Sequence, residues 1–91
     1  MQIQIKKITS DELNTLHIFS WPIWEKEPSE FEWYYDAEEH CYFLQGEVEV
    51  YNQDKSKKLA TISPKDYVIF PKGLKCIWKI KSLVKKHYKF K

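Results

Sequence analysis

Apolar and polar residues alternate along several stretches of the chain, as they do in half-buried β-strands. The alternation runs through QIQIKKI (2–8), SEFEWYYD (29–36) and LKCIWKIK (74–81). A long strand is expected for HCYFLQGEVEVY (40–51), broken or bulged near Gly46, and shorter ones for KLATI (58–62) and the tail VKKHYKF (84–90). Turn residues in NQDKSKK and SPKD separate these segments. Short strands spaced by turns over so short a chain predict a small all-β barrel or sandwich.

One short helix is predicted near the N-terminus, ahead of the main run of strands. Thr9 offers a capping hydroxyl and Glu12 an acid three residues later, so the helix should extend to about Leu16. No repeat or linker interrupts the chain. We therefore expect one domain over residues 1–91, with a strand and helix in 1–20 and the barrel in 21–91.

Composition favours a compact core, since 43% of the 91 residues are hydrophobic and 16% aromatic. Such a core needs neither a disulfide nor a structural metal. Cys41 and Cys76 lie far apart without a CxxC motif, so we expect two free thiols in a reducing cytoplasm. The sequence shows neither a signal peptide nor a stretch long enough to span a membrane, and no membrane partner is expected.

Charge is unevenly distributed although the net charge is only +2. Acids dominate from Glu25 to Asp54, and after Asp66 the only charged residues other than a histidine are lysines. All 15 basic residues are lysines, so the arginine fork that reads guanine and clamps phosphate is missing, and nucleic acid is not an expected partner. Acidic and basic strands are expected to face each other across a sheet or to solvate it. We expect a solvated basic face from Lys85, Lys86, Lys89 and Lys91.

Four consecutive residues that can ligate metals, Glu38, Glu39, His40 and Cys41, begin the long strand. Successive side chains on a strand point to opposite faces, so Glu39 and Cys41 share one face while Glu38 and His40 share the other. The four cannot form one site unless the strand is broken there. Both rows also contain apolar residues, so periodicity alone does not decide which row points inward.

The segments WPIWEKEPSEFEWYYDAEEHCYFLQGEVEV, SPKDYVIFPKGLKCIWKI and KKHY together resemble a known family. From Trp21 onward the chain is similar to small single-domain, RmlC-like cupins of the ureidoglycine aminohydrolase-like (DUF861) group, which also includes ethanolamine-utilisation cupins. The motifs WPIWE, SEFxWYYD and FPKGLxCxW are those of its short stand-alone bacterial members. The resemblance implies a jelly-roll β-barrel and leaves the activity open. Because cupins commonly pair through N-terminal strands, it also implies a homodimer to which QIQIKKI crosses.

Metal-binding cupins carry three histidines and a glutamate, and the resemblance assigns these positions here. Gly46 places the glutamate at Glu39 and two histidine positions at Trp33 and Tyr35, while Cys76 takes the last. Only Glu39 keeps its ligand type, since tryptophan does not ligate a cation and cysteine suits zinc or copper. The resemblance thus implies no tightly held metal or other cofactor, with a weakly bound divalent transition metal as the alternative. It also turns Glu39, Cys41 and Phe43 inward and makes His40 a surface or interface residue.

The inward residues permit a functional and a structural interpretation. Burial could raise the pKa of Glu39 and make it a general acid or base, or Glu39 could simply be held by Tyr35 or an indole. Cys76 is either a nucleophile or an inert core thiol. Trp33, Tyr35, Cys41 and Trp78 either bind a ligand or form ordinary core. For Trp21 and Trp24 we expect a plug or dimer contact, and for His17 and His87 a structural role.

Two functions follow from these alternatives. The first is a binding protein that holds a small polar metabolite in the barrel without a tightly held metal. The second is an enzyme of the aminohydrolase or isomerase type, in which Glu39 moves a proton with help from Cys76 or a weakly bound metal. The loss of imidazoles favours the first, and the survival of Glu39 and Cys76 at ligand positions keeps the second open.

Overall fold

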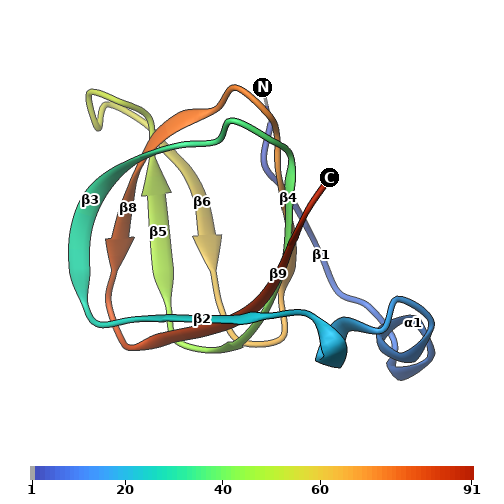
Figure 1. Cartoon of the computed structure of the whole chain (residues 1–91). Helices are drawn as coiled ribbons and strands as arrows, with labels where there is room; N and C mark the ends of the chain where they lie inside the picture. Colours follow the sequence, from blue (N-terminus) through green and yellow to red (C-terminus); the bar gives the residue numbers. More distant parts are fainter. Residues whose placement is uncertain (1) are drawn as a thin grey trace.

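Nine strands, a short α-helix and a 3₁₀ turn make up the protein in the computed structural model, which describes residues 2–91 (Figure 1). In chain order the elements are β1 (Gln4–Lys6), α1 (Ser10–Thr15), η1 (Ile18–Ser20), β2 (Ile23–Lys26), β3 (Ser29–Tyr34), β4 (Glu39–Gln45), β5 (Val48–Tyr51), β6 (Lys58–Ile62), β7 (Tyr67–Phe70), β8 (Lys75–Ile80) and β9 (Val84–Phe90). The predicted all-β fold with one short N-terminal helix is confirmed.

The strands form two antiparallel sheets that face each other across the core (Figure 1). One sheet has five strands in the order β1-β7-β4-β9-β2, and the other has four in the order β3-β8-β5-β6. Each sheet keeps its own hydrogen-bond ladders, so the two make a jelly-roll-like sandwich and not a closed barrel. β1 pairs with β7 of its own chain, and its predicted crossing to a partner stays a prediction.

Helix α1 begins with the predicted capping box. The backbone N–H of Glu12 donates to the Thr9 hydroxyl over 3.1 Å, and the Glu12 carboxylate accepts from the Thr9 N–H over 3.1 Å. The chain then turns through His17 in a left-handed conformation, with φ of 54°. This places Ile18 of η1 in a small apolar cluster with Tyr42 and Tyr67. No helix within residues 2–91 has the length and apolar character needed to cross a membrane.

The predicted long strand is two strands that belong to different sheets. β4 lies in the five-stranded sheet and β5 in the four-stranded one, and the chain passes between the sheets at Gly46. Gly46 has a φ of 97°, and a Cβ there would lie 2.4 Å from the Leu83 carbonyl oxygen. Only glycine fits this crossing, because it combines a left-handed backbone with close contact to another main chain. The break near Gly46 is therefore confirmed, and its cause is the change of sheet.

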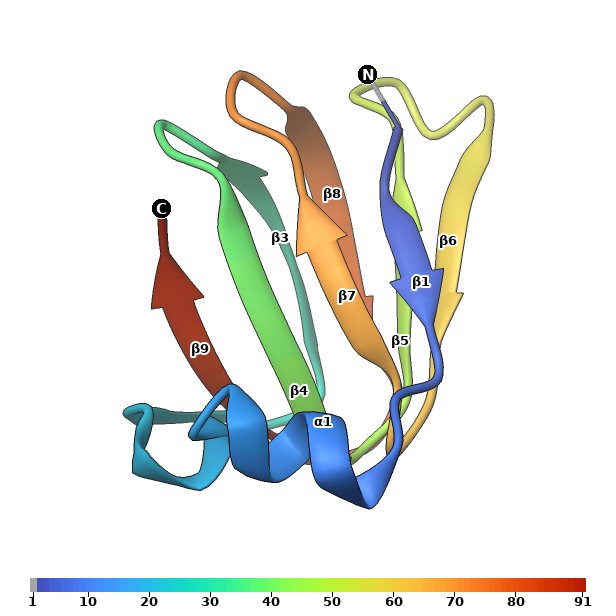
Figure 2. The ribbon, with the colours of Figure 1, turned by 90° about the vertical axis from the view of Figure 1, so that its right-hand side faces the viewer.

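The core lies between the sheets and follows the predicted strand faces. Cys41 and Phe43 of β4 point into it, as do the inward residues of β8 and of the turn before it: Leu74, Cys76, Trp78 and Ile80. Figure 2 shows β4, β7 and β9 side by side in one layer, with β3, β8, β5 and β6 behind. One side of this core remains hollow and forms the candidate site.

Candidate functional site

An aromatic cavity of about 200 Å³ opens between the two sheets. Its walls come from β2, β3, β4, β8 and β9 and from Tyr35 just after β3. Seven aromatic residues and one acid–base pair line it, namely Trp24, Phe31, Trp33, Tyr35, Trp78, Tyr88, Phe90, Glu39 and Lys86. Trp33 and Phe90 are 44% and 50% exposed and form the rim, whereas Glu39 and Lys86 are each only 4% exposed and form the floor.

Strand alternation explains the aromatic wall. Phe31, Trp33 and Tyr35 stand on one face of β3 and its continuation, and in the ladder with β8 Phe31 lies opposite Trp78. The rings of Phe31 and Trp78 are stacked with centroids 6.1 Å apart, and Trp24 meets Trp78 edge-on at 5.8 Å. The cavity is thus lined by the flat faces and edges of fixed rings, which suits a flat ligand.

Trp24 belongs to this wall. The plug or dimer contact that the sequence suggests for Trp21 and Trp24 stays a prediction. Trp24 lies on the edge strand β2, and its side chain turns between the sheets because β2 pairs with β9 at Lys86. Trp21, by contrast, lies near Tyr67, with ring centroids 6.5 Å apart, away from the cavity.

The floor of the cavity is an ion pair between Glu39 and Lys86. Lys86 Nζ lies 3.1 Å from Glu39 Oε2 and 3.3 Å from Cys41 Sγ. β4 and β9 are neighbours in the sheet, and their register places Phe43 opposite Lys86, so both side chains point inward. The alternative in which Glu39 is held by Tyr35 or an indole is wrong, because its side-chain partner among residues 2–91 is Lys86.

The prediction that Lys86 belongs to a solvated basic face is also wrong. Along β9 the inward positions are those of Val84, Lys86 and Tyr88, so Lys86 falls on the core face while Lys85 and Lys89 point outward. The sequence does contain a signal for this burial, because Lys86 lies two residues from the apolar Val84 and therefore on the same face of the strand. The many lysines of the tail favoured the opposite interpretation, because a lysine is seldom buried without a partner.

Aromatic rings surround the Lys86 ammonium as well. Its nitrogen lies 4.9 Å and 5.0 Å from the ring centroids of Trp78 and Trp24, and 5.8 Å and 5.9 Å from those of Phe43 and Phe70. Such cation–π contacts stabilise a desolvated cation. Burial alone would lower the pKa of Lys86, but its interactions with Cys41 and Glu39 outweigh burial and raise that pKa. Lys86 is therefore an ammonium at neutral pH.

Both thiols predicted for the site are free and buried. Burial raises the pKa of Cys41 far above its ordinary value, although Lys86 partly opposes this effect, and burial raises the pKa of Cys76 to about 11. Neither is a thiolate at neutral pH, and a neutral thiol is a weak nucleophile. Cys41 is connected to the cavity floor by its hydrogen bond with Lys86. Cys76 lies opposite Trp33 in the β3–β8 ladder and does not line the cavity.

Tyr35 links the wall to the core. Its hydroxyl accepts a hydrogen bond from the Trp78 indole N–H over 3.1 Å, and its ring stacks on Phe70 with centroids 4.7 Å apart. Burial and, after it, the charge of Glu39 raise the pKa of Tyr35 well above the ordinary value. The phenol therefore stays neutral and is a poor metal ligand.

A metal does not fit this set of side chains. Within the described residues no three His, Cys, Asp or Glu side chains gather in a way that could hold a metal ion. Of the four positions that correspond to cupin ligands, only Glu39 offers an ionised oxygen, and the Lys86 ammonium already lies against it. A divalent ion at this carboxylate would face a fixed positive charge at close range.

His40 faces away from the cavity, as expected, but it is not a surface residue. Its Nδ1 forms a 2.6 Å hydrogen bond with the Tyr67 hydroxyl and its Nε2 a 2.9 Å one with Glu38, and only 8% of it is exposed. Tyr67 lies on the neighbouring strand β7 and covers the ring. His87 is likewise buried and contacts the Trp21 carbonyl oxygen over 2.9 Å, whereas His17 is exposed.

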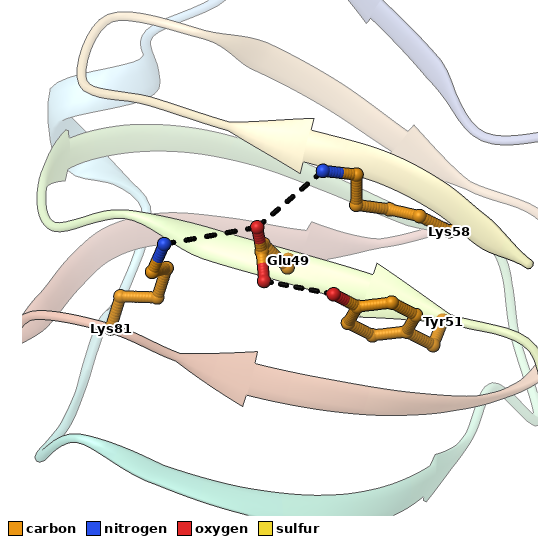
Figure 3. A network of polar contacts seen from close by, with 4 residues as sticks. All are labelled: Glu49, Tyr51, Lys58 and Lys81. Atoms are coloured by element: carbon orange, nitrogen blue, oxygen red, sulfur yellow. Dashed lines mark hydrogen bonds and ion pairs between the residues drawn. The ribbon is translucent and has the colours of Figure 1, made fainter. Parts of the chain in front are cut away.

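The outer face of the four-stranded sheet carries a separate polar network around Glu49 (Figure 3). Tyr51 donates to Glu49 over 2.9 Å, and Lys58 and Lys81 lie 3.5 Å and 3.8 Å from its carboxylate. The hydrogen bond from Tyr51, followed by the two lysines, lowers the pKa of Glu49. Here acidic and basic strands do face each other, on a solvated surface remote from the cavity residues.

The sequence profile of the EutQ-like cupin domain matches residues 13–88. The protein is an EutQ-like cupin. This cupin is similar over 99% of its length to a DUF861 family protein from Thermotoga maritima, with 50% sequence identity, a TM-score of 0.93 and coverage of all of that chain. The predicted family is therefore confirmed.

More distant solved structures share the fold with this cupin. The EutQ protein of Clostridium difficile is 17% identical with a TM-score of 0.67, over 97% of this chain and 66% of that one. A putative ethanolamine utilization protein Q from Salmonella typhimurium is 15% identical with a TM-score of 0.65, over 97% of this chain and 68% of that protein's chain. A search among curated proteins gave no match. The comparisons establish family and fold, and the site must be interpreted from its own chemistry.

Proposed function

We propose that this cupin binds a small polar metabolite in the aromatic cavity and does so without a tightly held metal. The observation that carries the proposal is the Glu39–Lys86 pair on the floor of a cavity that opens to solvent past Trp33. Ligand pockets of this kind combine mostly apolar walls with a few polar groups that converge on one point. The free, buried thiols fit a reducing cytoplasm, where we expect the protein to act.

A buried ion pair is a poor way to stabilise a core, which supports a functional role. Desolvating two charges can offset their attraction, and well-packed apolar residues are often as stable or more so. A structural need alone would be met by leucine or methionine at positions 39 and 86. The pair is instead placed where a ligand can reach it.

Lys86 also supplies the cation that a metal would supply in other cupins. It neutralises Glu39 and is itself held by Cys41 and the surrounding rings. We therefore propose that a divalent ion does not bind tightly here, because the carboxylate already has a partner.

The enzyme alternative has weaker support. A nucleophile or base must be available in its deprotonated form at working pH, yet the raised pKa values of Lys86 and Cys76 keep both protonated. Glu39 is engaged with Lys86 and would have to leave that pair to accept a proton. Binding without chemistry requires none of these changes.

Two matched variants on β3 test the binding proposal. Trp33 lines the cavity rim and Tyr34 points to the opposite face, yet they are similarly exposed at 44% and 53%. We expect a metabolite panel, screened by thermal shift and tryptophan fluorescence, to contain ligands whose affinity falls at least about fivefold in Trp33→Ala, since ring contacts contribute about 1 kcal/mol or more. Tyr34→Ala should bind like the parent. Equal losses in both variants, or a panel without ligands, would contradict the proposal.

Metal content tests the second half of the proposal. Purified protein is incubated with zinc, nickel or copper, desalted and analysed by mass spectrometry for bound metal. We expect far less than one ion per chain, because Lys86 competes for the only ionised ligand. Stoichiometric metal that is lost in both Glu39→Gln and Cys76→Ser would show instead a working metal site.

A further inference from the structure

The ion pair on the cavity floor has hydrogen-bonding capacity left over. Glu39 uses Oε2 for Lys86, and its Oε1 accepts no hydrogen bond from a nitrogen or oxygen donor among residues 2–91; the Cys41 thiol, a weak donor, also lies beside this carboxylate. Every fully buried side-chain nitrogen or oxygen in this part of the chain has a partner, so the unpaired Oε1 must retain accessible surface. The carboxylate therefore offers an acceptor to a ligand.

Lys86 has a donor to spare beside that acceptor. An ammonium has three N–H groups. Those of Lys86 have two hydrogen-bond partners, Glu39 Oε2 and Cys41 Sγ, and the third meets aromatic rings but no hydrogen-bond acceptor among residues 2–91. The floor therefore presents one free acceptor and one free donor on two side chains that are bonded to each other, Lys86 Nζ to Glu39 Oε2 over 3.1 Å. A ligand that satisfies both must carry a donor directly next to an acceptor.

Charge restricts the ligand further. The carboxylate and the ammonium cancel, and the remaining lining residues are the seven aromatic ones. A charged ligand would lose its hydration without meeting an unpaired opposite charge, which is costly in such surroundings. The cavity thus favours a neutral ligand.

Shape completes the argument. The walls are ring faces and edges, among them Trp24, Phe31 and Trp78, and the volume is about 200 Å³, which accommodates a single ring with small substituents. We propose that the ligand is a neutral, planar heterocycle with a ring N–H next to a ring C=O, a cyclic amide. Its N–H donates to Glu39 Oε1 and its C=O accepts from Lys86 Nζ. This inference rests on the proposed function and specifies its ligand class.

Three small probes of similar size test the ligand class. 2-Pyridone carries the adjacent N–H and C=O, N-methyl-2-pyridone lacks the donor, and benzoate is an anion. Dissociation constants come from nuclear magnetic resonance titrations that follow the tryptophan indole N–H signals. We expect 2-pyridone to bind at least about tenfold more tightly than either of the others, because loss of a hydrogen bond leaves a buried polar group unpaired.

Each outcome distinguishes this inference from the proposed function. Equal binding of 2-pyridone and its N-methyl form would overturn the inference, as would tighter binding of benzoate, and both would leave metabolite binding intact. If none of the three probes binds, the inference fails, and the proposed function fails only when the wider metabolite panel is also negative.

A variant pair checks the position of the probe. Glu39→Gln should weaken 2-pyridone binding at least about fivefold, since the charged acceptor becomes a neutral amide oxygen, which accepts a hydrogen bond less strongly. Glu38→Gln, one residue away on the opposite face of the strand, should leave its affinity unchanged. If Glu39→Gln does not fold, the comparison of the three probes on the parent protein still decides the question.

Discussion

Lys86 shows how the surroundings of one side chain set its chemistry. It is one of several lysines in the tail, yet it alone lies between a carboxylate, a thiol and four aromatic rings. Its neighbour Lys85 forms a longer, 3.5 Å contact with Glu25 at the surface. Two consecutive residues of the same type thus differ in burial, partner and expected effect on stability.

Replacing each of these lysines by methionine should separate the two roles. Lys86→Met leaves Glu39 buried without its cation, and we expect a loss of about 3–5 kcal/mol in the free energy of unfolding. Lys85→Met removes an exposed pair and should cost about 1 kcal/mol or less. Urea denaturation measures both.

A double variant checks the cause of that loss. In Glu39→Leu/Lys86→Met neither charge remains, so most of the stability lost in Lys86→Met should return. If the double variant is as unstable as the single one, packing around the Lys86 side chain, and not the unpaired carboxylate, would be responsible.

At the scale of elements, the passage from β4 to β5 determines where the site residues stand. β4 carries Glu39 and Cys41 in the five-stranded sheet, and β5 lies between β8 and β6 in the other sheet. Near the end of β4, its register against β9 shifts from Phe43 to Gln45. The chain then turns at Gly46, whose backbone lies close to the main chain of Leu83. The crossing holds the two sheets together at one end of the core.

Gly46→Ala should therefore damage the fold more than its small size suggests. The new methyl group would meet the Leu83 carbonyl at 2.4 Å while the backbone keeps a φ of 97°, so we expect a loss of at least about 2 kcal/mol. Gln45→Ala, at the exposed neighbouring position, is the control and should stay within about 0.5 kcal/mol. Thermal and urea unfolding would both report the difference, and equal stability of the two variants would contradict it.

At the scale of the whole molecule, the core contains groups that burial keeps neutral. Burial raises the pKa of Cys76 from about 9 to about 11, and burial also raises the pKa values of Cys41 and Tyr35. In the unfolded chain these groups ionise at their ordinary values. Between those values and the raised ones, the folded protein binds more protons than the unfolded chain.

This difference predicts alkaline instability. Because the folded state binds more protons, the free energy of unfolding should be constant at neutral pH and fall as pH rises from about 9 to about 11. Urea unfolding at several pH values measures the decrease, and Cys76→Ala should show a smaller one than the parent. Stability that stays constant or rises over this range would contradict the raised pKa values.

Local patterns predicted much of the fold and half of the site. The alternation in SEFEWYYD and LKCIWKIK is confirmed, since Phe31, Trp33 and Tyr35 share one face of their strand, and Cys76 and Trp78 share the inward face of β8. The prediction of the capping box at Thr9 also held, because a cap depends on residues that lie close in the sequence.

The remaining part of the site could not be read from such patterns. Trp24 lies two residues after Pro22, on an edge strand, and only the pairing of β2 with β9 turns it toward the cavity. His40 was correctly turned away from the core, but its cover by Tyr67 comes from a strand 27 residues further along. Burial of this kind depends on which strands become neighbours.

By itself, the sequence determined the all-β fold, the short capped helix, the break at Gly46 and the shared strand face of Glu39 and Cys41, since side-chain alternation, caps and turns are local properties. The inward direction of that face was implied by the family resemblance. Only the tertiary structure decided what Glu39 meets. Lys86 is 47 residues away, and the register of β4 against β9 brings the two within 3.1 Å. Sheet register depends on the packing of the whole core, so the partner of the buried carboxylate became visible only in the folded molecule.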